Sequence, residues 1–216
     1  MTFSFESGMD ERYEKKRKDG RKRYGQIMEV ALVLFAGKGY HATSIEDIIQ
    51  EAGIARRTFY THFNSKEDLL LKIITHQLRV LSEFIDFSLN RISGKADRDE
   101  IIKITIDSTK HISTLPEMKY FGRMMLGEII GMRGVFWNPI EGFMEKMKGL
   151  TINAINRLHD SGVINKQNTD PLVAALCMIG GIKELIYTAL VREEPMALET
   201  TIHTMVNFFL QGLFDA

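Results

Sequence analysis

Residues 26–66 read QIMEVALVLFAGKGYHATSIEDIIQEAGIARRTFYTHFNSK, and this stretch decides the fold. Its first part places apolar residues on one side of a helix. Gly39 follows as a helix stop, because glycine enters the left-handed conformation without a steric penalty. A second helix opens at Thr43-Ser44-Ile45-Glu46, where Thr43 and Glu46 match the capping-box pattern. Gly53 suits the tight turn before a third helix over residues 55–62, so the stretch predicts a helix-turn-helix.

The third helix is basic and carries no acid. Two arginines at its start are of the type that bonds guanine O6 and N7 in a major groove. Hydroxyl, imidazole and ammonium groups nearby are of types that bond phosphate oxygens and fix register. The residues predicted to bind DNA are Arg56, Arg57, Thr58 and Tyr60, with Thr43, Ser44, His62 and Lys66 as phosphate contacts. The alternative is a small amphipathic helix with a solvated basic face.

At these positions the sequence resembles the DNA-binding domain of the TetR (tetracycline-repressor) family of transcriptional regulators. The matching residues are Phe35, Gly39-Tyr40, Thr43-Ser44, Ile48, Ala52-Gly53, Thr58, Tyr60, His62-Phe63 and Lys66-Glu67. The resemblance implies a homodimer whose two recognition helices read a palindromic operator. It also implies a C-terminal helical domain that senses a small molecule and usually releases DNA.

Two departures from the family pattern stand at the start of the recognition helix. The family often has Ser where this chain has Ala55, and Lys-Gly where it has Arg56-Arg57. The missing hydroxyl removes a helix cap, and the second arginine implies a different base preference. The operators of relatives are therefore not assumed for this chain.

Charge is unevenly distributed along the chain. Lys+Arg and Asp+Glu both total 28 in 216 residues, yet residues 12–66 hold 12 Lys and Arg against 6 Asp and Glu. Residues 67–216 hold 16 against 19. Positive charge thus coincides with the helix-turn-helix, as phosphate neutralisation requires. A composition with 44% hydrophobic and 26% charged residues is ordinary for a folded protein and excludes wholesale disorder.

Three segments are expected: a flexible basic arm over residues 1–20, a helix-turn-helix domain over residues 21–66, and a helical effector-binding and dimerisation domain over residues 67–216. Two readings of the arm stay open. It is either a solvated tail or frayed extension of the first helix, or a basic segment that lies along phosphates or in the minor groove, with Arg21, Lys22 and Arg23 as its contacts.

The fold class is expected to be all-α, because no stretch alternates convincingly with period two. Beyond the helix-turn-helix, the pattern predicts helices over residues 66 to 89 or 91, 98–113, 117–132, 140–159, 170–191 and 196–214. Methionine and aromatic residues concentrate in the middle of the chain, and such side chains suit an adaptable apolar pocket. The candidate pocket residues are Phe87, Met118, Phe121, Met125, Trp137 and Phe143. Ordinary core packing is the alternative for each one.

The last two predicted helices are the expected dimer surface. The helix that begins at Pro171 is apolar nearly all round, so it must be covered on both sides, and the last helix has a broad apolar face. A two-fold dimer matches a palindromic operator. Packing of both helices within one monomer is the competing interpretation.

Other classes of protein find little support. Cys177 is the lone cysteine, expected to be a buried inert thiol, which excludes an internal disulfide and fits the reducing cytoplasm. The apolar run from Leu172 to Ile182 is shorter than the ~20 residues of a membrane span. We find no catalytic motif and no metal-ligand spacing among the six histidines, and we predict no cofactor.

Together these observations predict a cytoplasmic, ligand-responsive transcriptional repressor and not an enzyme. Its partners would be double-stranded operator DNA, a small hydrophobic or amphiphilic effector and a second copy of the chain. Two alternatives remain: a DNA-binding protein of the same fold that no small molecule controls, and a helical enzyme or binding protein with a vestigial motif.

Overall fold

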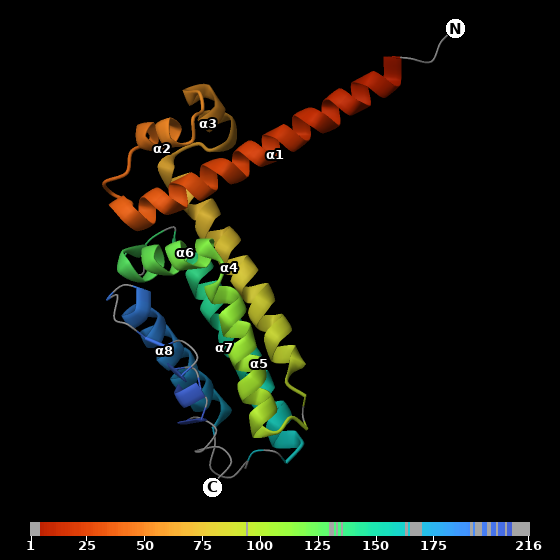
Figure 1. Ribbon diagram of the computed structural model, residues 1–216, viewed down its shortest axis with the longest axis vertical. Coiled ribbons are helices and arrows are strands. Elements are labelled where there is room, and N and C mark those ends of the chain that lie inside the picture. Colours follow the sequence, from red (N-terminus) through yellow and green to blue (C-terminus); the bar gives the residue numbers. More distant parts are fainter. Residues whose placement is uncertain are drawn as a thin grey trace. The chain divides into compact units, whose positions relative to one another are not determined.

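The computed structural model is all-α in the residues that it describes (Figure 1). Its backbone is described for residues 5–93, 95–129, 132, 134, 136–162, 164, 170–190, 192, 196, 197, 200, 201, 203–205, 207 and 208. Side chains are described for the same residues except 5–17, 98, 112, 113 and 190. The chain divides into two compact units, Met1–Ile73 and Ile74–Ala216.

The first unit is the helix-turn-helix predicted from the sequence. It contains α1 (Phe5–Lys38), α2 (Ile45–Glu51) and α3 (Arg56–His62), and α2 packs against both of the others. The predicted apolar stripes meet in its core, which includes Ile27, Ala31, Phe35, Ile48, Phe59 and Phe63. Gly39 has φ 93° and ends α1, and Gly53 has φ 60° in the turn before α3. Both glycines adopt conformations that a side chain would strain.

Helix α1 is much longer than its apolar stripe. It begins at Phe5, whereas the period-3.6 pattern begins near residue 26. The added residues are rich in Glu, Lys and Arg, which are good helix formers in the absence of packing. A search for apolar periodicity cannot detect a helix of this kind.

The cap of α2 lies one residue later than predicted. Ser44 is the N-cap: its hydroxyl accepts from the backbone N–H of Asp47, and the Asp47 carboxylate accepts from the N–H of Ser44. The prediction of a capping box between Thr43 and Glu46 was wrong. The Thr43 hydroxyl instead donates to the Gly39 carbonyl oxygen at 2.7 Å.

The second unit holds most of α4 (Lys66–Arg91), which begins in the first unit, together with α5 (Arg98–Ser113), α6 (Pro116–Gly127), α7 (Trp137–Asp160) and α8 (Pro171–Leu190). Most bounds match the predicted ones. Helix α6 ends at Gly127 and not near residue 132, because glycine is a poor helix former. Helix α7 begins at Trp137, three residues early, because Pro139 is tolerated in a first turn, where its missing N–H has no intrahelical partner.

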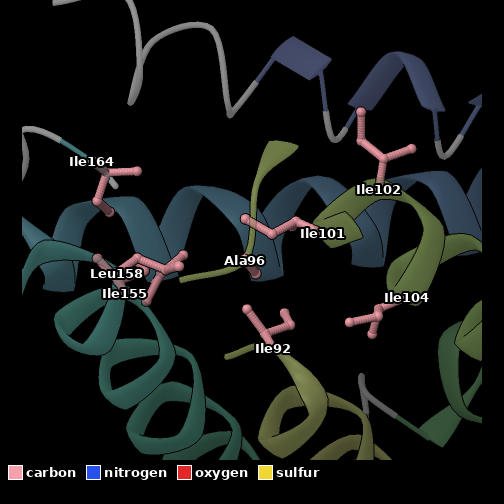
Figure 2. Close-up of a cluster of buried hydrophobic side chains, with 9 residues drawn as sticks. Ile92, Ala96, Ile101, Ile102, Ile104, Ile155, Leu158 and Ile164 are labelled. Atoms are coloured by element: carbon pink, nitrogen blue, oxygen red, sulfur yellow. The ribbon is translucent and has the colours of Figure 1, made fainter. Parts of the chain in front are cut away.

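A cluster of buried aliphatic side chains forms part of the second unit's core (Figure 2). It joins the end of α4, the start of α5, the end of α7 and one face of α8, and its members are Ile92, Ala96, Ile101, Ile102, Ile104, Ile155, Leu158, Ile164 and Ala175. The Arg157 guanidinium on α7 donates to the Leu89 carbonyl oxygen at 2.7 Å and to the Asn90 side chain at 3.2 Å. These contacts fasten α7 to the end of α4.

Helix α8 is largely uncovered. Its apolar side chains Val173 and Leu176 are 55% and 54% exposed, and the Cys177 thiol is exposed, not buried as predicted. Residues Pro171–Ala189 are long and apolar enough to cross a membrane by length and composition, and 6% of that segment is buried. The prediction that the apolar run is too short to span a membrane, which counted only residues 172–182, was therefore wrong. The apolar helix continues past Lys183 and Glu184. Of the last predicted helix, described residues between 200 and 208 are helical, and residues 209–214 lie outside the described part.

Candidate nucleic-acid interface

Helix α3 is held against the first unit by one face. Phe59 and Phe63 are 0% and 1% exposed, and the rings lie 5.6 Å apart. The Gln26 side-chain amide on α1 donates to the Ala52 carbonyl oxygen at 3.0 Å, which fixes the turn that precedes α3. As the Ala55 substitution predicts, the helix begins without a side-chain cap.

The opposite face of α3 is open to solvent. Arg56, Arg57, Tyr60 and Thr61 are exposed, and Thr58 and His62 are half-buried. A short helix that exposes two guanidinium groups and hydroxyls has the dimensions and donors that a DNA major groove accepts. The structure brings Arg56, Arg57, Thr58 and Tyr60 together on one short helix, and their predicted roles in DNA binding stay predictions.

The two arginines of α3 differ in their surroundings. The Arg56 guanidinium is ion-paired with the Glu46 carboxylate on α2 and lies 5.8 Å from the centroid of the Tyr60 ring. The negative charge of Glu46 raises the pKa of Arg56 above its ordinary value, with a smaller contribution from Tyr60. Within the described part of the chain, the Arg57 guanidinium has no hydrogen-bond or ion-pair partner. Arg57 is therefore available for a base or phosphate without breaking an internal contact.

Ser44 and Thr43, both predicted to bond phosphate, have unlike environments. Ser44 is exposed, and its hydroxyl oxygen accepts from Asp47, so its own O–H remains free to donate. Thr43 is 1% exposed, with its hydroxyl engaged by the Gly39 carbonyl. We therefore keep Ser44 among the proposed phosphate contacts and leave Thr43 out.

Lys66, a third predicted phosphate contact, is occupied inside the unit. Its ammonium donates to the carbonyl oxygens of Tyr40 at 2.9 Å and Thr43 at 2.8 Å, and it lies 4.4 Å from the centroid of the Tyr40 ring. An ammonium has three donors, so these contacts use most of its capacity. Lys66 fixes the loop between α1 and α2.

The C-terminal end of α3 is fastened to the first turns of α4. The Lys72 ammonium donates to the His62 carbonyl oxygen at 3.0 Å and pairs with the Asp68 carboxylate at 3.0 Å. The backbone N–H of Asn64 donates to Asp68, which lowers the pKa of that carboxyl, and the bond from Lys72 lowers it further. The His62 carbonyl oxygen thus anchors the end of α3 to Lys72 on α4. The His62 ring is half-buried beside Tyr24.

Residues that sequence reasoning passed over also shape this surface. Glu46 holds Arg56, Lys72 holds the end of α3, and the Tyr24 ring on α1 stacks on Phe63 with centroids 5.0 Å apart. Tyr24 had a usable signal, because it stands three and seven residues before Ile27 and Ala31 and so extends the buried stripe of α1. Nothing in the residue order singles out the pairing of Glu46 with Arg56.

The candidate pocket residues lie on α4, α6 and α7 of the second unit and differ in burial. Phe121 and Met125 are 4% and 7% exposed, and Met118 and Phe143 are half-buried. Phe87 is 63% exposed and Trp137 is 42% exposed, unlike the lining of an enclosed cavity. Of the six candidates, therefore, only Phe121 and Met125 on α6 have the burial expected of pocket residues. A ligand role for any of the six stays a prediction.

Residues 27–73 match the family model described as bacterial regulatory proteins, tetR family. This segment contains residues 27–38 of α1, together with α2 and α3, so the match covers the helix-turn-helix and the start of α4.

Similarity to known proteins extends over nearly the whole chain. The fatty acid metabolism regulator protein of Bacillus subtilis is 24% identical over 202 residues, which are 92% of this chain and 99% of that protein. The crystal structure of the transcriptional regulator FadR from Bacillus subtilis in complex with stearoyl-CoA has a TM-score of 0.72, with 22% identity over 88% of this chain and 99% of that one. SmeT, the repressor of a Stenotrophomonas maltophilia multidrug efflux pump, has a TM-score of 0.70, with 19% identity over 88% and 89% of the two chains. The two structural likenesses concern the fold.

Proposed function

Because this chain belongs to the TetR family of bacterial regulatory proteins, we propose that it is a ligand-responsive transcriptional repressor. It binds a palindromic operator as a homodimer, and a small hydrophobic or amphiphilic effector releases it. Its relatives are transcription regulators, and we propose no catalytic activity for it. Since its target is chromosomal DNA, it acts in the cytoplasm.

One observation carries the DNA-binding part of this proposal: α3 buries Phe59 and Phe63 and turns its polar face outward. In our proposal Arg56, Arg57, Thr58 and Tyr60 contact the DNA, with the arginines at base edges, and Ser44 and His62 hold phosphates. Arg57 approaches the base edges most readily because it has no internal partner in the described residues.

Dimerisation is supported by the uncovered apolar surface of α8. Five of its large side chains are at least 40% exposed: Leu172, Val173, Leu176, Ile182 and Ile186. A monomer rarely leaves so many large apolar side chains of one helix in water. A second copy related by a two-fold axis covers the same stripe on both chains and positions two α3 helices for two half-sites.

The effector class is suggested by both chemistry and likeness. Buried Phe121, Met124 and Met125 on α6 give the second unit an apolar and deformable wall. The structure of FadR contains stearoyl-CoA, and one structure of SmeT contains triclosan. We therefore propose an amphiphile with a long apolar part, of which a long-chain acyl-CoA is the first candidate.

The test is selection of genomic DNA fragments by the purified protein, followed by sequencing of the retained fragments. We expect a two-fold symmetric motif, and its neighbouring genes would indicate the effector class. If no motif is recovered, native mass spectrometry must show an already bound ligand; an unliganded protein that selects nothing would overturn the proposal.

Effector control is tested by titrating the operator complex with stearoyl-CoA and, as a control, with coenzyme A alone. Release by the acyl form only would support the amphiphile class. Thermodynamic linkage requires that operator DNA weaken acyl-CoA binding by the same factor. A complex insensitive to acyl-CoA and to other amphiphiles would favour the alternative, a regulator of this fold without small-molecule control.

The dimer is tested with Leu176→Glu, a charge placed at the centre of the exposed α8 stripe, against Glu184→Gln on the same helix. We expect Leu176→Glu to yield monomers in light scattering and to bind the operator far more weakly. A dimer that persists would show that α8 is not the interface.

A further inference from the structure

We propose that residues 18–23 of α1 form a second DNA-binding surface, which contacts phosphates outside the base pairs that α3 reads. The inference rests on the proposed function, because it names a further partner surface of the same DNA-bound protein. It concerns a part of α1 that precedes the segment matched by the family model, residues 27–73.

Residues 18–23 carry cations that are available to DNA, unlike most other cations of the first unit. In the first unit, Lys38 pairs with Asp47, Arg56 with Glu46 and Lys72 with Asp68, and Lys66 is held by carbonyl oxygens. Lys18, Arg21, Lys22 and Arg23 are exposed, and none has an ion-pair or hydrogen-bond partner in the described residues. Among the lysine and arginine side chains described in this unit, those without an ion-pair or hydrogen-bond partner in the described residues are Arg57 and the four on this segment of α1.

The basic segment of α1 lies beside the end of the recognition helix. The Tyr24 ring stacks on Phe63 with centroids 5.0 Å apart and meets the His62 ring edge-on at 6.0 Å. Tyr24 thus fixes this point of α1 to the C-terminal end of the recognition helix. Arg21 stands three residues earlier in the same helix and so lies on the same side as Tyr24. A phosphate beside the C-terminal end of α3 is therefore also beside Arg21, at the end of the basic segment nearest Tyr24.

The basic segment continues the packed part of α1 as one helix. Helix α1 is unbroken from Phe5 to Lys38, so residues 18–23 have a direction set by the packed part of the helix (Figure 1). Six helical residues extend over about 9 Å, at about 1.5 Å per residue. Duplex DNA carries one phosphate charge per ~1.7 Å of its axis, so several phosphates lie within reach of such a segment.

The composition favours DNA over a membrane or an apolar protein surface. Residues 12–23 contain eight Lys and Arg against two acids, and residues 14–23, EKKRKDGRKR, contain no apolar side chain. A helix that lies on a membrane needs an apolar face, which this segment does not have. Charge without an apolar face suits the phosphate backbone, which is bound without regard to sequence.

The experiment compares the full-length protein with the triple variant Arg21→Gln/Lys22→Gln/Arg23→Gln. The matched control is Lys95→Gln/Lys103→Gln/Lys146→Gln, which removes three exposed positive charges from the second unit. Each protein is titrated, over a range of salt concentrations, with a short operator that ends at the recognised base pairs and with one extended by about ten flanking base pairs on each side. Circular dichroism verifies that the variants remain helical.

We expect the wild-type protein and the control to bind the extended operator more tightly than the short one. The arm variant should lose this preference, and its slope of log K against log salt should fall by about 0.9 per lost phosphate contact, up to about 2.7 per subunit. The loss should be equal for flanks of different sequence. Equal slopes for variant and wild type would overturn the inference, as would a loss confined to one flank sequence. Failure of the wild-type protein to bind any operator would instead overturn the proposed function.

Discussion

The guanidinium of Arg56 on the recognition helix is ion-paired with the carboxylate of Glu46 on the preceding helix, and both side chains are more than 60% exposed. An exposed pair of this kind contributes about 0–1 kcal/mol, so a DNA phosphate or guanine can displace Glu46 at small cost. The pair therefore holds Arg56 in place in the free protein. Because it is weak, it reduces the affinity of Arg56 for DNA only slightly.

We expect Glu46→Gln to bind the operator up to about fivefold more tightly, because Arg56 is then released and one negative charge leaves the interface. Arg56→Ala should weaken binding. The double variant separates the two causes in a thermodynamic cycle measured by fluorescence anisotropy. A gain from Glu46→Gln that is equally large in the Arg56→Ala background would mean that the ion pair itself has no effect.

Arg57 has no partner in the described residues, and its replacement tests direct base reading. Arg57→Ala should cost about 1–3 kcal/mol of operator binding and relax base choice at one position of each half-site, if the guanidinium bonds guanine in two places. The measurement is binding to a library of operators with single base changes. Uniform weakening on every sequence would instead identify Arg57 as a phosphate contact.

Replacement of Lys66 distinguishes a structural role of its ammonium from the phosphate contact predicted from the sequence. Lys66→Met keeps the aliphatic chain but removes the ammonium that donates to the carbonyls of Tyr40 and Thr43. We expect a loss of about 1–3 kcal/mol in unfolding free energy and an unchanged salt slope of operator binding. Unchanged stability with a slope lower by about 0.9 would restore the phosphate contact, and Lys103→Met serves as the control for loss of a charge.

The contrast between Lys66 and Arg57 shows which properties of the site can be predicted from the sequence and which cannot. Helical period, Gly39, Gly53 and the basic third helix predicted the fold of the first unit, because each depends on neighbours in the chain. Whether a cation is free depends on contacts between distant residues, such as Lys66 with Tyr40 or Arg56 with Glu46. Residue type alone cannot reveal such pairing.

The second unit shows the same division. The bounds of α5 and the start of α8 follow from periodicity and from Pro171, and they were predicted correctly. Burial was not predictable, since Phe87 and Phe121 have the same side chain in similar apolar surroundings along the sequence, yet are 63% and 4% exposed. Their exposure is set by which helix lies opposite, a property of tertiary packing.

Acid should destabilise the first unit through Asp47 and Asp68. The hydrogen bond from Lys38 and then those from Ser44 hold the pKa of Asp47 well below its ordinary value, and Asp68 is lowered in the same direction. A lowered folded-state pKa means that the unfolded chain binds protons first as pH falls. The stabilisation is therefore complete above the unfolded pKa of about 3.9 and is lost below it, toward the folded pKa.

The check is the melting temperature of wild type, Asp47→Asn and Asp68→Asn between pH 7 and pH 3. Each variant should melt lower than wild type at pH 7, and the difference should begin to shrink below about pH 4, where the carboxyls of the unfolded wild-type chain bind protons before those of the folded protein. Curves that stay parallel over this range would show that the lost stability is not linked to protonation.

Two glycines of the first unit should respond in opposite directions to the same added methyl group. Gly25 lies within α1 and Gly53 lies in the turn at φ +60°, and no atom stands within 4 Å of a Cβ added at either position. Gly25→Ala should therefore raise the unfolding free energy by up to about 1 kcal/mol, because alanine is the better helix former. Gly53→Ala should lower it by about 1–2 kcal/mol, since an L side chain is strained at positive φ. Urea unfolding measures both, and because space is open at each site, a stable Gly53→Ala protein would mean that the turn relaxes its backbone and does not need glycine.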